Sequence, residues 1–249
     1  MARNLVRDAA LPITWLFLHT PVTANQVTLA SLVIGVVGVI CLALPLKSMF
    51  LIGSLLFQFW YLLDHVDGQI ARYRKTACLS GRFFDFITHH LIHGIVFFGL
   101  GMYCFYAKGG VFFVVWGFVM SIGIMLFNLT HDTQCKTFFE KILTVKQILV
   151  KAVKSNEKST AALAERTIFR KVFSVIHKAC EIHVLMNILT FCALIEFFIP
   201  MSPDFRLILF LFYGLAVPFL AITKISYLIL YRKIDREFED LFSISEDSN

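Results

Sequence analysis

Six apolar stretches, each long enough to cross a lipid bilayer, constrain the fold of this chain more than any other feature. They lie at residues 26–45, 48–66, 83–106, 111–130, 183–200 and 207–230. The hydrocarbon core of a bilayer is about 30 Å thick, and a helix of roughly 20 apolar residues spans it. Backbone amides in lipid have no water to bond, so we expect these stretches to be helices.

The composition excludes the other broad classes. Of 249 residues, 58% are hydrophobic and only 16% are charged. A soluble globule of this size has too little interior to hide so much apolar surface, and a disordered chain has far less of it. The sequence therefore predicts an all-α polytopic membrane protein with six transmembrane helices.

We predict one integral membrane domain, residues 1–249, with peripheral amphipathic segments. Its parts are an interfacial N-terminal helix (1–22), the first four spans (23–132), a cytoplasmic amphipathic segment (133–181), the last two spans (182–231) and a tail (232–249). The motif discussed below occupies residues 64–89 of this domain.

The basic residues predict the orientation. Every Lys and Arg except Lys47, Lys108 and Arg206 falls on the side of the predicted bundle that carries both termini. By the positive-inside rule this side is cytoplasmic. The net charge of +6 favours contact with anionic membrane lipid. Nucleic acid is not an expected partner, because the sequence shows no compact soluble basic domain.

Ionisable residues gather where the second predicted span ends and the third begins. Asp64 and Asp67 are three residues apart, and Asp85 and His89 are four apart, so each pair shares one helix face. Charged groups at such positions are costly, which makes the cluster a functional hypothesis. Two antiparallel helices joined by a short link would bring the two faces together.

Carboxylates that converge repel one another unless a cation lies between them. Mg²⁺ accepts carboxylate oxygens and keeps open positions for phosphates. Gly68, Ala71 and Gly81 add no bulk and leave room for a nucleotide, and Arg72 is expected to be the only fixed cation close by. The pattern favours a two-metal phosphoryl-transfer site that handles a pyrophosphate.

At this point the chain resembles the CDP-alcohol phosphotransferase family, whose signature is Asp-x2-Asp-Gly-x2-Ala-Arg-x8-Gly-x3-Asp-x3-Asp. Seven of the eight positions match, and they are Asp64, Asp67, Gly68, Ala71, Arg72, Gly81 and Asp85. The segment from Thr23 to Thr28 is similar to the Pro-Asn-x-x-Thr element that commonly precedes the first span. The six-span layout extends the resemblance over most of the chain.

The resemblance implies transfer of a substituted phosphate from a CDP-linked donor, CDP-diacylglycerol or a CDP-alcohol, to an alcohol or polyol acceptor, with release of CMP. The implied metal ligands, for two divalent cations (Mg²⁺ or Mn²⁺), are Asp64, Asp67, Asp85 and His89. The implied CDP-binding residues are Asn25, Gly68, Ala71, Arg72 and Gly81. Known relatives imply a homodimer.

His89 stands where the family has its fourth aspartate, and Cys78 where members often have Ser or Thr. A neutral imidazole serves well as a general base, and we assign His89 that role. It also ligates divalent metals, with a preference for Mn²⁺ or Zn²⁺ over Mg²⁺. A packing role for His89 and loss of activity remain open, as does a metal-ligand role for His93.

Two further hypotheses follow from the same residues. Arg74 and Lys75 are candidates for binding a phosphorylated acceptor, although the topology rule alone accounts for basic residues here. The alternative function is a catalytically altered or inactive relative that acts as a nucleotide- or lipid-binding scaffold. A transporter is a third option, but no span shows the paired mid-bilayer breaks of transporters.

Overall fold

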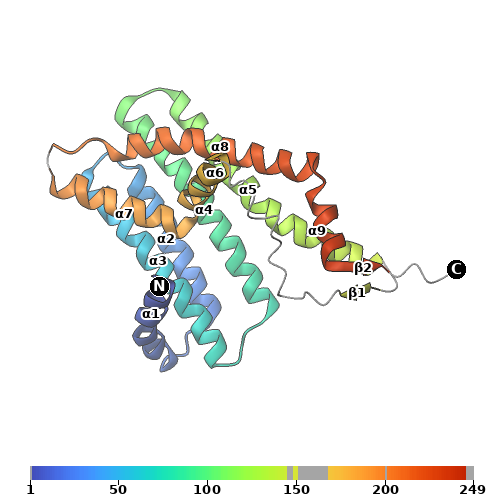
Figure 1. Ribbon diagram of the computed structural model, residues 1–249. Helices are drawn as coiled ribbons and strands as arrows, with labels where there is room; N and C mark the ends of the chain where they lie inside the picture. Colours follow the sequence, from blue (N-terminus) through green and yellow to red (C-terminus); the bar gives the residue numbers. More distant parts are fainter. Residues whose placement is uncertain (1, 145–147, 151–167, 200, 245–249) are drawn as a thin grey trace.

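The computed structural model describes residues 2–144, 148–150, 168–199 and 201–244, and these are almost entirely helical (Figure 1). The helices are α1 (Ala2–Leu18), α2 (Ala24–Ala43), α3 (Lys47–Tyr73), α4 (Leu79–Lys108), α5 (Val111–Thr144), α6 (Ile168–Cys180), α7 (Ile182–Phe198), α8 (Phe205–Leu230) and α9 (Lys233–Leu241). Two three-residue strands, β1 (Ile148–Val150) and β2 (Phe242–Ile244), pair antiparallel. The predicted all-α class is confirmed, with this small ribbon added.

Several of the described helices are suited to crossing a membrane. Helices α2, α3, α4, α5 and α8 are each long and apolar enough to do so. Helix α7 has 17 residues, and it reaches the required length only together with α6, to which it is joined at a bend of 76°. The chain is thus a multi-pass membrane protein, and its described residues contain five such helices, or six spans when the bent pair is counted as one.

The largest extensions beyond the predicted spans are at the ends of α3 and α5. Helix α3 continues to Tyr73, although its apolar stretch ends at residue 66, because hydropathy marks the end of the lipid-facing segment and not the end of the helix. Helix α5 continues to Thr144, where a separate surface segment from residue 133 was expected; residues 131–144 contain neither Pro nor Gly to stop it. Residues 145–147 and 151–167 of that predicted segment lie outside the described residues.

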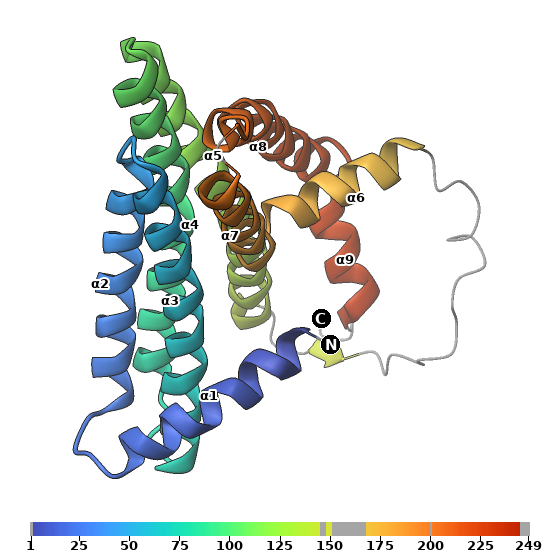
Figure 2. The ribbon, with the colours of Figure 1, turned by 90° about the vertical axis from the view of Figure 1, so that its left-hand side faces the viewer.

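Helices α2, α3 and α4 run side by side, and glycines let them approach closely (Figure 2). A Cβ atom added at Gly53 of α3 would lie 2.7 Å from the carbonyl oxygen of Gly38 in α2. Small residues at such contacts allow the dispersion forces that hold membrane helices together to act over a short distance. This packing sets the start of α2 and the start of α4 against the end of α3.

Helix α1 crosses the end of this three-helix layer (Figure 2). Ala10 of α1 is buried with Val27 of α2 and with Leu63, Val66 and Ile70 of α3. The opposite side of α1 exposes large apolar side chains, Leu11, Trp15 and Leu16. This two-sided pattern is the one expected for an interfacial helix.

The far end of the bundle is held by a buried ion pair. Arg206 at the start of α8 is 1% exposed and lies 3.4 Å from Glu196 of α7. Its guanidinium also donates to the Leu44 carbonyl at 2.6 Å and lies over the ring of Tyr103, 3.7 Å from the centroid. Arg206 is therefore a packing residue that joins four helices or their ends.

The bend between α6 and α7 leaves backbone carbonyl groups without hydrogen-bond donors from their own helix. Side chains of other helices donate to these carbonyls instead. The His93 Nε2 group of α4 donates to the Cys180 carbonyl at 2.8 Å, and the Tyr213 hydroxyl of α8 donates to the Ala179 carbonyl at 2.9 Å. Asn128 of α5 donates in turn to Nδ1 of His93 at 3.0 Å. His93 thus uses both ring nitrogens in structural hydrogen bonds.

Candidate active site

Three helix termini meet at the end of the bundle that α1 covers. Helix α2 begins with a capping box, in which the Thr23 hydroxyl accepts from the Gln26 N–H and the Gln26 side chain accepts from the Thr23 N–H. Helix α4 is capped by Cys78, whose thiol accepts from the Gly81 N–H at 3.4 Å. A link of five residues, 74–78, joins α3 to α4. The motif residues of both helices therefore face one another.

Asp64, Asp85 and His89 form a cluster with the spacing of a metal site. Each offers one ligand atom, and these atoms all lie within 4.8 Å of one another. His89 Nε2 lies 2.5 Å from Asp64 Oδ1 and 3.6 Å from Asp85 Oδ1. Since a carboxylate only accepts, Nε2 carries the hydrogen of the short bond to Asp64.

The donor set fits a divalent cation. Asp85 Oδ1 is buried and has no hydrogen-bond partner among the described residues. A buried acceptor without a partner costs free energy that a bound cation would recover. The two carboxylates suit Mg²⁺ or Mn²⁺, and the imidazole would add a ligand that favours Mn²⁺ once Nε2 exchanges its hydrogen for the metal.

Asp67, the remaining predicted metal ligand, lies one helical turn from Asp64 and outside that three-residue cluster. Its Oδ2 atom accepts a hydrogen bond of 2.6 Å from the hydroxyl of Thr28 in α2, and both side chains are nearly fully buried. This contact ties α2 to α3 beside the cluster. No role was predicted for Thr28, whose sequence signal is its place at the end of the Thr23–Thr28 element.

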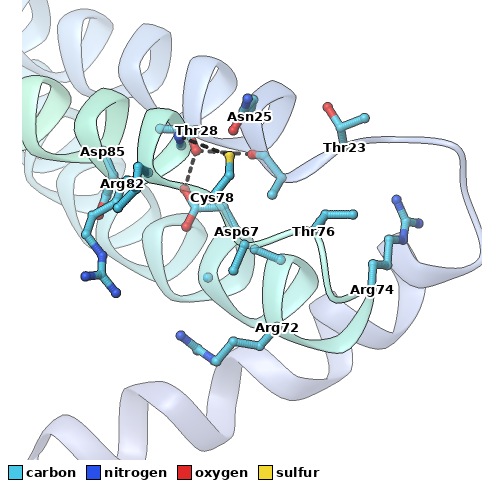
Figure 3. Close-up of a pocket in the computed structure, with 16 residues that line it drawn as sticks. Thr23, Asn25, Thr28, Asp67, Arg72, Arg74, Thr76, Cys78, Arg82 and Asp85 are labelled. Carbon is cyan, nitrogen blue, oxygen red and sulfur yellow. Dashed lines mark hydrogen bonds between the residues drawn. The ribbon is translucent and has the colours of Figure 1, made fainter.

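A cavity of about 700 Å³ opens between these helix ends (Figure 3). Its volume falls in the range of small-molecule sites. All five predicted CDP-binding residues line it: Asn25, Gly68, Ala71, Arg72 and Gly81. Asp67 and Asp85 form part of the same wall, so a molecule in the cavity reaches the acidic cluster.

Small residues keep this cavity open. A Cβ atom added at Gly81 would lie 3.3 Å from Oδ1 of Asn25 and 3.4 Å from the Cys78 thiol. A Cβ atom added at Gly68 would lie 3.2 Å from Nη1 of Arg72. Gly68 therefore permits the Arg72 side chain to lie along the end of α3.

The expectation that Arg72 is the only fixed cation close by is corrected by the structure, since Arg74 and Arg82 also line the cavity. The Arg74 guanidinium donates to backbone carbonyls where α1 ends, at 2.6 Å to Val22 and 2.6 Å to Thr20. It fixes α1 to α3. The acceptor role of Arg74 and Lys75 stays a prediction, and Arg82 was missed although it directly follows the motif residue Gly81.

Cys78 places an exposed thiol in the cavity wall. The Ser80 hydroxyl and then the Gly81 N–H bond to its sulfur, and these contacts lower the pKa of the thiol below its ordinary value. Exposure and a lowered pKa favour reaction of this thiol with alkylating reagents, and the thiol also caps α4.

These features define a class: a polytopic helical membrane protein with an acidic cluster beside a polar cavity formed by three helix ends. A profile of the CDP-alcohol phosphatidyltransferase family matches residues 21–195, and the chain belongs to that family. The suspected resemblance is confirmed, and at the family level the chain is a transferase of phosphate-linked groups from CDP-alcohols in lipid synthesis. A comparison with curated protein sequences returns no match.

Proposed function

We propose that this protein is a metal-dependent CDP-alcohol phosphotransferase that moves a substituted phosphate from a CDP-linked donor to an alcohol and releases CMP. One observation carries the proposal: Asp64, Asp85 and His89 converge beside a cavity that Asp67, Gly68, Arg72 and Gly81 line. Among the functions considered, this one uses both the acidic cluster and the cavity.

In the proposed reaction the acceptor oxygen forms a bond to the donor phosphorus that bears the alcohol. The bond from that phosphorus to the oxygen bridging to CMP breaks, and CMP leaves with the electron pair. Asp64, Asp67 and Asp85 are the candidate ligands of two divalent cations, which would supply Lewis-acid stabilisation of the developing charge. His89, also a predicted ligand, has no ring nitrogen left for a metal when it acts as the base, since Nε2 carries a hydrogen and Nδ1 takes the proton. Arg72 and Arg82 add fixed positive charge in the cavity wall.

We propose that His89 is the general base that removes the proton from the acceptor's hydroxyl group. Its Nε2 hydrogen is held by Asp64, so a neutral ring has its lone pair on Nδ1, and Nδ1 takes the proton. The Asp64 carboxylate then stabilises the imidazolium that forms, as in other Asp–His pairs.

The basic flanks support an orientation with this site, and both termini, on the cytoplasmic side. We propose a single integral membrane domain, with α1 and α6 lying at the interface. The homodimer implied by the resemblance stays a prediction.

One observation favours the alternative, a nucleotide-binding scaffold without turnover. The 2.5 Å contact to His89 occupies one oxygen of Asp64, a predicted metal ligand. If this contact excludes the cations, nucleotide binding persists without transfer.

The test is CMP release by the purified full chain in lipid nanodiscs. We would supply CDP-diacylglycerol with water-soluble alcohols, and CDP-choline with diacylglycerol, each with Mg²⁺, Mn²⁺ or EDTA. We expect release with at least one pair, its loss in EDTA and its loss in Asp85→Asn. CDP binding without release from any pair would instead establish the scaffold.

A further inference from the structure

A second cavity of about 710 Å³ lies between α1 and the ends of α3 and α4. It shares Asp67, Gly68, Arg72 and Asp85 with the cavity assigned to the nucleotide. The Arg72 side chain extends from the end of α3 toward α1 (Figure 3), and it lines both cavities. Molecules in the two cavities would therefore meet at the same carboxylates.

This arrangement suits the two substrates of a transfer reaction. The attacking and leaving oxygens of a phosphoryl transfer lie roughly in line, on opposite sides of the phosphorus. If the first cavity holds CMP as the leaving group, the attacking alcohol enters from another side of the acidic cluster. The second cavity has an opening there and a wall that includes Asp64 and Asp85.

Helix α1 is fixed over this second cavity by a polar tether. The Gln69 side chain of α3 donates to the Arg7 carbonyl at 2.9 Å and accepts from the Thr14 hydroxyl at 2.6 Å. Arg74 holds the other end of α1 through the Thr20 carbonyl. The tether places Arg7 itself at the cavity mouth, because Gln69 bonds to the backbone of that residue.

The wall of the second cavity selects the chemistry of its ligand. Apart from Leu11 and Gly68, every lining side chain is charged or polar. Acyl chains would gain nothing from such a wall, whereas hydroxyl groups find acceptors among its carboxylates and an anionic group finds charged donors on Arg7 and Arg72. His65 adds an acceptor, since its Nδ1 donates to the Tyr61 carbonyl at 2.9 Å and Nε2 of the neutral ring keeps its lone pair.

Arg7 forms no ion pair with the described residues, although it lines the same wall as several carboxylates. An arginine at a cavity mouth binds phosphate or carboxylate through two parallel hydrogen bonds. We infer that the cavity under α1 is the acceptor site, and that the acceptor is a small water-soluble alcohol with an anionic group held by Arg7. This inference rests on the proposed transferase function.

The experiment measures CMP release by the full chain in nanodiscs with CDP-diacylglycerol as the donor. The acceptors that carry an anionic group are sn-glycerol 3-phosphate, myo-inositol 1-phosphate and serine, which separate phosphate from carboxylate; myo-inositol is the uncharged comparison. We expect turnover with an anionic acceptor. Arg7→Gln should raise the KM for that acceptor about tenfold and leave the KM for the donor within twofold, and Arg7→Lys should restore part of the loss.

Lys136→Gln is the matched control, because Lys136 is a basic residue of α5 whose side chain is 75% exposed and lies outside both cavities. It removes the same charge from the surface and should leave both KM values unchanged. A second readout is calorimetric titration of the accepted alcohol into the protein without donor, where Arg7→Gln should weaken the dissociation constant by the same factor.

The possible outcomes test the acceptor site and the transferase function separately. Turnover only with myo-inositol, or only with diacylglycerol and CDP-choline, overturns the inference and leaves the transferase function in place. If Arg7→Gln leaves the KM for the acceptor unchanged, the inference is likewise overturned and the transferase function stands. No CMP release from any pair overturns the proposed function, and the inference with it.

Discussion

His89 of α4 and Asp64 of α3 form a hydrogen bond of 2.5 Å from Nε2 to Oδ1. The residue at the fourth aspartate position of the motif is therefore paired with the first aspartate. The ring of Trp60 packs edge-on against the imidazole, with 5.1 Å between centroids. One polar and one aromatic contact thus fix the orientation of His89. A general base needs such a fixed orientation, because its nitrogen must face the proton that it removes.

His89→Ala should abolish turnover while CDP still binds. Removal of a general base typically lowers the rate about 10²- to 10⁴-fold. The nucleotide cavity does not include His89, so the dissociation constant for CDP, measured by calorimetry, should change less than twofold. Undiminished turnover in this variant would show that His89 is not the base.

His89→Asp should shift the metal preference toward Mg²⁺. A carboxylate is a harder ligand than an imidazole, and hard oxygen donors suit Mg²⁺. We expect the ratio of the rate in Mg²⁺ to the rate in Mn²⁺ to rise in this variant relative to the wild type. An unchanged ratio would mean that His89 takes no part in choosing the metal.

Thr28→Val removes the hydroxyl that donates to Asp67 and keeps the side-chain shape. Because this bond lies in a buried position, its loss should lower the free energy of unfolding by about 1–3 kcal/mol. Thermal unfolding in detergent measures the change. Thr88→Val is the control: Thr88 is as buried, but among the described residues its hydroxyl donates only to the Phe84 carbonyl of its own helix, so the loss should be smaller.

Spacing in the sequence predicted the parts of the site that lie on two consecutive helices. Asp64, Asp85 and His89 meet as expected, since helical periodicity fixes which side chains share a face. Contacts between helices far apart in the chain were not predictable in this way. Thr28 with Asp67 and Gln69 with Arg7 depend on how α2 and α1 pack on α3, which hydropathy does not encode.

The ends of the helices likewise include some features that the sequence predicts and others that it does not. The apolar stretches located the spans, but α3 and α5 continue past them as ordinary helices whose polar residues face water or protein. The break at Glu181 lies where the predicted amphipathic segment (133–181) meets the last two spans (182–231), but its angle of 76° could not be predicted from hydropathy. It depends on tertiary contacts: His93 and Tyr213 donate to the carbonyls at the bend.

Alkylation of Cys78 should be blocked by CDP and should inactivate the protein. Its thiol is exposed in the wall of the nucleotide cavity, and its lowered pKa keeps more thiolate at a given pH, so labelling begins at lower pH than for an ordinary thiol. Maleimide labelling followed by mass spectrometry measures both effects. Cys135 is exposed on α5 away from the cavity, and CDP should not protect it.

Cys78→Ser should retain activity and resist inactivation by the maleimide. A serine hydroxyl caps a helix at least as well as a thiol does. Inactivation of Cys78→Ser at the wild-type rate would place the sensitive cysteine elsewhere.

His93→Ala should destabilise the fold without changing the dependence on metal. His93 is 6% exposed, and its loss leaves the Cys180 carbonyl at the α6–α7 bend without its donor. An unsatisfied buried carbonyl costs about 1–3 kcal/mol, which thermal unfolding detects. The neighbouring His90 is the control, since its side chain is 33% exposed and pairs with Asp132 at 3.2 Å; His90→Ala should change stability by less than about 0.5 kcal/mol. A higher Mn²⁺ concentration for half-maximal rate in His93→Ala, at a temperature where the variant is folded, would instead make His93 a metal ligand.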